Sequence, residues 1–277
     1  MFRLVRVSAC ASALVLAAMV SVPSASAGAA QKSIPVVFVH GFFANKCPGL
    51  NVRSVMSGPT HELANNGWTG ALDIVSFYAC DQGGSRIGED TVDTSIRRIG
   101  LQLAGYIYRK YTSQGQPVDI VAHSIGGLAA RVAIKFTAAK ASGFPPSLLV
   151  HRVVTFSAPY EGVEPWAIRA VPGLRGTREA REVRVGSSFL TSLATRGNVA
   201  GTQWLVIGSS GRDCDVVRGA SAVGVPHAIR LRYIGCYSHL WYLSDATKTR
   251  SLPAYRNGAR TMAYGPLKQM RLFLAKS

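Results

Sequence analysis

Six short runs of apolar, β-branched and aromatic residues recur along the chain, and they restrict its fold more than any other feature. These runs are residues 35–40, 73–78, 118–122, 152–156, 204–207 and 229–234. Most are nearly continuous Val, Ile and aromatic residues, a composition typical of strands covered on both faces of a sheet. The first four intervals between the runs are long enough for crossover helices, which connect parallel strands.

Segments with helical character lie between or after these runs. They are residues 61–66, 96–111, 125–140 and 267–274. The alternation of strands and helices predicts an α/β fold with a doubly wound sheet of about six mostly parallel strands. The alternation of strands and helices is interrupted at residues 162–202, which are rich in Pro, Gly and Arg. This predicts a loop or cap excursion over one end of the sheet.

The first 27 residues have the features of a secretory signal peptide. Arg3 and Arg6 precede an apolar core at residues 9–20, and Ala-Ser-Ala at residues 25–27 supplies the small residues of a cleavage site. The apolar core is too short for a membrane anchor. We therefore expect cleavage after Ala27, export of the protein, and a single α/β domain over residues 28–277, because no repeat or linker divides them.

The chain is strongly basic, with 31 Lys and Arg against 14 Asp and Glu and a formal net charge of +17. Such a balance agrees with simple solubility and equally with attraction to anionic lipid or cell-wall surfaces. The basic residues are scattered, with residues 169–184 as the only dense stretch, and no nucleic-acid recognition module is present in the sequence. We therefore expect no nucleic-acid partner.

Four cysteines remain after the expected cleavage, namely Cys47, Cys80, Cys214 and Cys236. An even number in an exported protein predicts two disulfides. No C-x-x-C or histidine-rich spacing indicates a metal site, so we expect none.

The strongest indication of chemistry is Ser124, which follows the run 118–122 and precedes the helical segment at residues 125–140. A serine on a sharp turn from strand to helix is held clear of the sheet, and the residues two before and two after it must be small. Here these are Ala122 and Gly126. The N-terminus of the following helix would face an oxyanion that forms at the serine.

Several motifs in the same order resemble small secreted bacterial lipases and esterases of the α/β-hydrolase superfamily. They are Ala-His-Ser-Ile-Gly-Gly at 122–127, the strand and His-Gly turn at 36–42, Ser-Ala-Pro-Tyr-Glu-Gly at 157–162, and the segment 186–193. The resemblance extends over about residues 34–239. The chain departs from the family at Ala122, where a glycine is usual, and lacks the first two strands of larger members. The resemblance, with these two strands missing, implies a minimal α/β-hydrolase fold.

The resemblance also implies an oxyanion hole made by the backbone N–H groups of Phe42 and Ile125. Two such donors must lie about 3 Å from the oxygen that becomes negative. Because these donors belong to the main chain, the identity of the side chains at these two positions has little effect on the oxyanion hole. We expect His40 and His123 to brace their loops by hydrogen bonding and to take no direct part in the chemistry.

In this fold the catalytic order is serine, acid, histidine, which leaves His227 and His239 as candidates for the base. His227 precedes the last strand, at the wrong end of the sheet, whereas His239 follows it at the end that carries Ser124. The acid should follow the preceding strand, where Asp213 and Asp215 both lie. Asp215 matches the family's pattern around the catalytic acid better than Asp213 does. Asp213 would then be a turn residue.

The resemblance implies a serine hydrolase that cleaves carboxylic esters through an acyl-enzyme, without cofactor or metal. Apolar residues near Ser124 in the sequence favour an apolar acyl chain and hence a lipase, although each of them could belong to the core. They are Phe42, Phe43, Ile125, Leu240 and Trp241. Trp166 and the excursion at 162–202 could form a lid or an acyl pocket, or the excursion could be a plain loop. The expected partner is an ester or lipid substrate, and we expect a monomer.

Two other functions remain open at this point. An acyltransferase or thioesterase could use the same fold with a different acyl donor or acceptor. A non-catalytic binding member of the fold is disfavoured by the complete set of serine, acid and histidine.

The family's sheet order implies the pairing of the cysteines. It places the strands at 35–40 and 73–78 side by side, and likewise the strands at 204–207 and 229–234. One cysteine follows each of these strands, and a disulfide requires Cα atoms only a few ångströms apart. The prediction is therefore Cys47–Cys80 and Cys214–Cys236.

Overall fold

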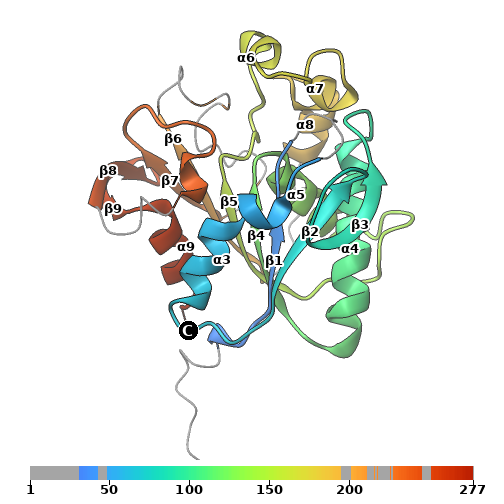
Figure 1. Cartoon of the computed structure of the whole chain (residues 1–277), viewed down its shortest axis with the longest axis horizontal. Coiled ribbons are helices and arrows are strands. Elements are labelled where there is room, and N and C mark those ends of the chain that lie inside the picture. The colour runs from blue at the N-terminus through green and yellow to red at the C-terminus, as the bar shows by residue number, and fades with distance from the viewer. Residues whose placement is uncertain are drawn as a thin grey trace, which may run out of the picture.

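The computed structural model describes residues 31–42, 49–194, 201–210, 215, 217, 225, 227–244 and 251–276. Within these residues nine strands form one sheet in the order β3-β2-β1-β4-β5-β6-β7-β8-β9 (Figure 1). The strands are β1 (Val36–Val39), β2 (Leu72–Tyr78), β3 (Ser85–Asp90), β4 (Val118–His123), β5 (Val150–Phe156), β6 (Gln203–Ser209), β7 (Ile229–Tyr233), β8 (Ser251–Arg256) and β9 (Ala259–Tyr264). From β3 to β7 all neighbours are parallel, and β8 and β9 add an antiparallel hairpin at one edge.

All six predicted strands are present, but the sheet is larger than the predicted six because three strands extend its edges. The sequence of β3 is Ser-Arg-Ile-Gly-Glu-Asp, which is too polar to be recognised as a buried strand. β8 and β9 meet at Asn257 and Gly258, whose φ angles are 51° and 93°. An Asn-Gly pair in this conformation is the usual signature of a two-residue hairpin, so this signal was present in the sequence.

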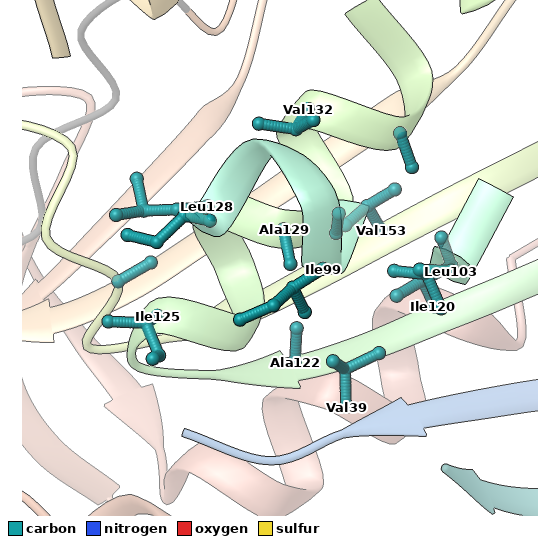
Figure 2. Close-up of a cluster of buried hydrophobic side chains, with 14 of the residues drawn as sticks. Val39, Ile99, Leu103, Ile120, Ala122, Ile125, Leu128, Ala129, Val132 and Val153 are labelled. Atoms are coloured by element: carbon teal, nitrogen blue, oxygen red, sulfur yellow. The ribbon is translucent and has the colours of Figure 1, made fainter. Parts of the chain in front are cut away.

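The central strands β1, β4, β5 and β6 are covered on both faces of the sheet, as their apolar sequences predict. Successive residues of a strand point to opposite faces. Val37 and Val39 therefore join one buried cluster with residues of α4 and α5, whereas Val36 and Phe38 join a second cluster with residues of α3 and α9. Figure 2 shows part of the first cluster, where α4 and α5 pack together over the strands. This two-sided core is the doubly wound α/β arrangement.

The predicted helices are present, each within a few residues of its expected bounds. The helices are α2 (Val52–Val55), α3 (Ser57–Ala64), α4 (Ile96–Lys110), α5 (Ile125–Ala138), α6 (Pro165–Ala170), α7 (Arg178–Val183), α8 (Ser188–Ala194) and α9 (Pro266–Leu274), with 3-10 turns η1 (Thr112–Gln114) and η2 (Trp241–Leu243). The excursion predicted at 162–202 contains three of them, α6, α7 and α8, which follow β5 and lie together at the top of Figure 1. Within the described ranges, no helix combines the length and the apolar character that a membrane crossing requires.

The contact between α4 and α5 gives a prediction with an internal control. A Cβ atom on Gly100 of α4 would lie 2.3 Å from Val132 Cγ1 and 2.8 Å from the Ala129 carbonyl oxygen of α5. A Cβ atom on Gly105 of the same helix would meet only the flexible end of Arg109. We expect Gly100→Ala to destabilise the protein by about 1–3 kcal/mol through overpacking. Gly105→Ala should instead stabilise it by up to about 1 kcal/mol through helix propensity.

Urea unfolding of both variants measures these changes. Equal effects of the two substitutions would contradict the close packing of α4 on α5 at Gly100.

Candidate active site

Ser124 occupies the sharp turn between β4 and α5, with a left-handed backbone at φ 54° and ψ −130°. Its N–H donates a hydrogen bond to the Phe156 carbonyl oxygen at 2.9 Å, which ties the turn to β5. A Cβ atom on Gly126 would lie 2.4 Å from the His40 carbonyl oxygen, so the first turn of α5 packs directly on the end of β1. Gly126 must therefore be small, as predicted for the position two residues after the serine, so that the helix can approach the strand.

The chain that leaves β1 passes close to Ser124. A Cβ atom on Gly41 would lie 2.6 Å from Ser124 Cβ, so only glycine permits this approach. His40 is fully buried: its Nε2 lies 3.0 Å from Asp81 Oδ2, and its ring stacks on Phe77 with centroids 4.0 Å apart. His40 thus anchors the turn, and Phe42 is the residue that follows Gly41 in the chain.

Asp215 and His239 form a hydrogen-bonded pair. His239 Nδ1 lies 2.8 Å from Asp215 Oδ1. The Asp215 residue is 4% exposed, whereas 23% of the His239 side chain is exposed. This arrangement selects the tautomer in which Nδ1 carries the proton and donates it to the carboxylate, which leaves Nε2 as the acceptor. The imidazole is therefore held and oriented by a buried carboxylate.

Three further groups of the described chain donate to Asp215, and the sequence analysis identified none of them. The hydroxyl of Ser157 donates to Oδ2 and also lies 3.1 Å from His239 Nδ1. The Tyr242 hydroxyl donates to Oδ2 at 3.0 Å, and the Val217 N–H donates to Oδ1 at 3.2 Å. Burial alone would raise the pKa of Asp215, but the hydrogen bonds and the charge of His239 outweigh it, so the pKa is lowered.

Ser157 has an unusual backbone for a residue with a side chain, with φ at 48°. It directly follows β5 and is 1% exposed. Backbone strain of this kind concentrates at functional sites. The sequence signal for Ser157 was its position at the carboxyl end of β5. This strand lies beside β4, which Ser124 directly follows.

His123 joins the turn at Ser124 to the loop of His239. Its Nε2 lies 2.9 Å from the His239 carbonyl oxygen, and the two imidazole rings have centroids 4.6 Å apart. The pair of Asp215 and His239 therefore lies beside the turn of Ser124. The structure forms no hydrogen bond between the described side chains of Ser124 and His239, and such catalytic contacts often tighten only when substrate is bound.

The family comparison agrees with this geometry over about half of the chain. Residues 30–167 match the family model described as "Putative serine esterase (DUF676)". Lipase B of Aspergillus fumigatus is similar in structure, with a TM-score of 0.51 and 15% sequence identity over 81% of this chain and 52% of that chain.

The chain has the α/β-hydrolase fold.

Two structures of the lipase BlEst2 from Bacillus licheniformis also match this chain. The mature form matches with a TM-score of 0.45 and 16% identity over 78% of this chain and 88% of that chain. The form with its propeptide matches with a TM-score of 0.47 and 17% identity over 78% of this chain and 48% of that chain. The chain spans about half the length of the Aspergillus lipase chain. A comparison with curated proteins finds no match.

The other candidate residues from the sequence lie as follows. His227 is exposed and precedes β7, at the opposite end of that strand from His239. Cys80 and Cys236 are each disulfide-bonded. Cys47, Cys214, Asp213, Phe43 and residues 1–27 lie outside the described residues, so the pairing and the signal peptide stay predictions. Among the described residues, no group of His, Cys, Asp and Glu has a metal-binding arrangement.

The burial of His123 predicts a dependence of stability on pH. Burial, reinforced by the charge of nearby His239, lowers the pKa of His123 from 6.5 to about 3. Between these values the unfolded chain binds a proton that the folded protein does not, so stability falls as the pH falls below 6.5. At about 1.4 kcal/mol per pH unit, acidification from pH 7.5 to 4.5 should cost roughly 2–3 kcal/mol through this residue.

The measurement is urea unfolding at both pH values for the wild type and for His123→Asn. The variant should lose less stability on acidification by that amount. Equal losses in the two proteins would show that His123 titrates normally in the fold.

Proposed function

We propose that this chain is a serine hydrolase of carboxylic esters, with Ser124 as nucleophile, His239 as general base and Asp215 as the acid that orients it. The observation that supports the proposal is a strained serine whose neighbour His123 contacts the loop of a histidine, which a buried carboxylate in turn holds at 2.8 Å. A serine, a base and an orienting acid in this relation form the usual apparatus of acyl transfer. The family match and the fold support the same conclusion.

In the proposed reaction, Ser124 Oγ attacks the ester carbonyl carbon while His239 Nε2 takes the hydroxyl proton. The tetrahedral intermediate then expels the alcohol, which takes that proton from Nε2, and the acyl group stays on Ser124. Water attacks the acyl-enzyme with help from the same nitrogen and releases the carboxylic acid. Asp215 stays ionised throughout, which its lowered pKa supports, and stabilises the imidazolium.

The negative oxygen of the intermediate would be bound by the backbone N–H groups of Ile125 and Phe42. Ile125 is the first residue of α5, so its N–H has no acceptor within the helix and points out of the helix N-terminus. Phe42 follows Gly41, which approaches Ser124 so closely that no Cβ atom fits. Both donors therefore belong to backbone segments next to the nucleophile.

The substrate in this proposal is an ester with an apolar acyl chain, which makes the protein a lipase or a related esterase. Leu240, directly after His239, is 61% exposed, and Trp166 of α6 in the cap excursion is 46% exposed. Apolar side chains exposed near a catalytic residue are suited to an acyl chain. Export after cleavage at Ala27 would place such an enzyme outside the cell.

Turnover of p-nitrophenyl butyrate by single variants tests the triad. Ser124→Ala should lower kcat/KM by about 10⁴-fold or more, and His239→Ala by a similar factor because the two residues act as a unit. Asp215→Asn should also lower it strongly, because the amide no longer holds the required tautomer.

Asp213→Asn is the matched control for the acid, since it makes the same chemical change two residues away. A larger loss from Asp213→Asn than from Asp215→Asn would move the acid to Asp213. Near-normal turnover in a folded Ser124→Ala or His239→Ala protein would rule out the mechanism.

A further inference from the structure

The edge of the sheet formed by β7, β8 and β9 carries a row of arginines on one face. Arg232 of β7 is paired in register with Tyr255 of β8, which is paired with Arg260 of β9. Residues paired in register point to the same face, and so does Arg230, two positions before Arg232. We call the outward side of these residues, together with Met262 of β9, the arginine face.

The arginine face points away from the core. The alternate residues of the same strands, Leu231, Tyr233, Ala254 and Ala263, are buried in the cluster beneath α3 and α9. Arg230, Arg232 and Arg260 are exposed, and Met262 is 62% exposed. No described helix covers this side of the hairpin, which lies at the edge of the molecule in Figure 1.

No acidic residue balances this charge within the three strands, whose sequences contain four arginines and neither Asp nor Glu. The fourth, Arg256, lies on the opposite face and donates to Gln269 Oε1 at 3.1 Å. Within the part of the chain that the structure describes, Arg230, Arg232 and Arg260 form no ion pair with a carboxylate. Their donors are therefore available to an external anion.

A hollow of about 150 Å³ lies on this face between Arg230, Arg232, Tyr255 and Gly258. The Arg232 guanidinium lies 5.1 Å from the centre of the Tyr255 ring, which holds it over the hollow. Two guanidinium groups on one side of a strand, about 7 Å apart along the backbone, can converge on one phosphate. Guanidinium groups bind phosphate through paired N–H donors.

We propose that the arginine face docks the protein on an anionic phospholipid surface, with one lipid phosphate bound in the hollow between Arg230 and Arg232. Exposed Met262 would rest at the boundary of the acyl chains, which suits an apolar tip among cationic groups. A single-stranded nucleic acid suits the face less well, since binding of that kind uses several free aromatic rings as stacking platforms, and Tyr255 is already covered by Arg232.

Vesicle sedimentation tests the proposal, with neutral phosphatidylcholine vesicles compared against vesicles that contain equal parts of phosphatidylcholine and phosphatidylglycerol. The wild type should bind the anionic vesicles preferentially at low ionic strength. Arg230→Gln/Arg232→Gln should weaken that binding by about 25-fold, at about fivefold for each arginine near an anionic surface. Arg109→Gln/Lys140→Gln removes the same charge from exposed positions on α4 and after α5, and should change binding by only a few-fold.

Equal losses in the two double variants would overturn the proposal, because binding would then follow net charge alone. Equal binding of the wild type to neutral and anionic vesicles would also overturn it. Tighter binding of a single-stranded oligonucleotide than of vesicles at the same salt, lost in Arg230→Gln/Arg232→Gln, would replace lipid by nucleic acid as the partner.

Docking on lipid does not depend on catalysis, and the variants already described distinguish the two functions. Ser124→Ala should bind anionic vesicles as the wild type does. Arg230→Gln/Arg232→Gln should hydrolyse soluble p-nitrophenyl butyrate at the wild-type rate. Loss of that hydrolysis would place the two arginines in the catalytic site and contradict a separate docking face.

Discussion

The left-handed backbone of Ser124 is the constraint on which the rest of the site depends. Such a conformation costs about 1–3 kcal/mol in a residue with a side chain, so it persists only where the surroundings enforce it. Here the enforcement comes from three directions: the hydrogen bond to the Phe156 carbonyl oxygen, the close contact of Gly126 with the end of β1, and the approach of Gly41 to the serine itself. The buried core between the sheet and the helices α4 and α5 holds all three in place.

A second requirement is a carboxylate that stays charged although it is buried. Asp215 meets it by accepting from four groups: His239 and Tyr242, which lie three residues apart, Ser157 after β5, and the N–H of its near neighbour Val217. These contacts lower its pKa against the effect of burial. His123 then links the loop of His239 to the serine turn, so the position of the imidazole is set by packing as well as by charge.

Most of the six predicted strands are nearly continuous apolar runs, and in β7 apolar residues alternate with arginines, so these strands could be predicted. The edge strand β3 could not, because its residues are polar. The hairpin of β8 and β9 was missed although Asn257 and Gly258 signalled its turn. Ser124, His239 and Asp215 were proposed from a local motif, a catalytic order and a family resemblance. Ser157 and Tyr242 were not. The only signal for Ser157 was its position at the carboxyl end of β5, and the hydrogen bond from Tyr242 to Asp215 leaves no pattern in the sequence.

The most direct measurement of the central claim is covalent labelling by a fluorophosphonate, followed by peptide mapping. An activated serine reacts fast with this probe, whereas an ordinary hydroxyl does not. The account predicts rapid labelling of Ser124 in the wild type, none in Ser124→Ala, and strongly slowed labelling in His239→Ala. Absence of labelling in the folded wild type, or a label on a different serine, would contradict it.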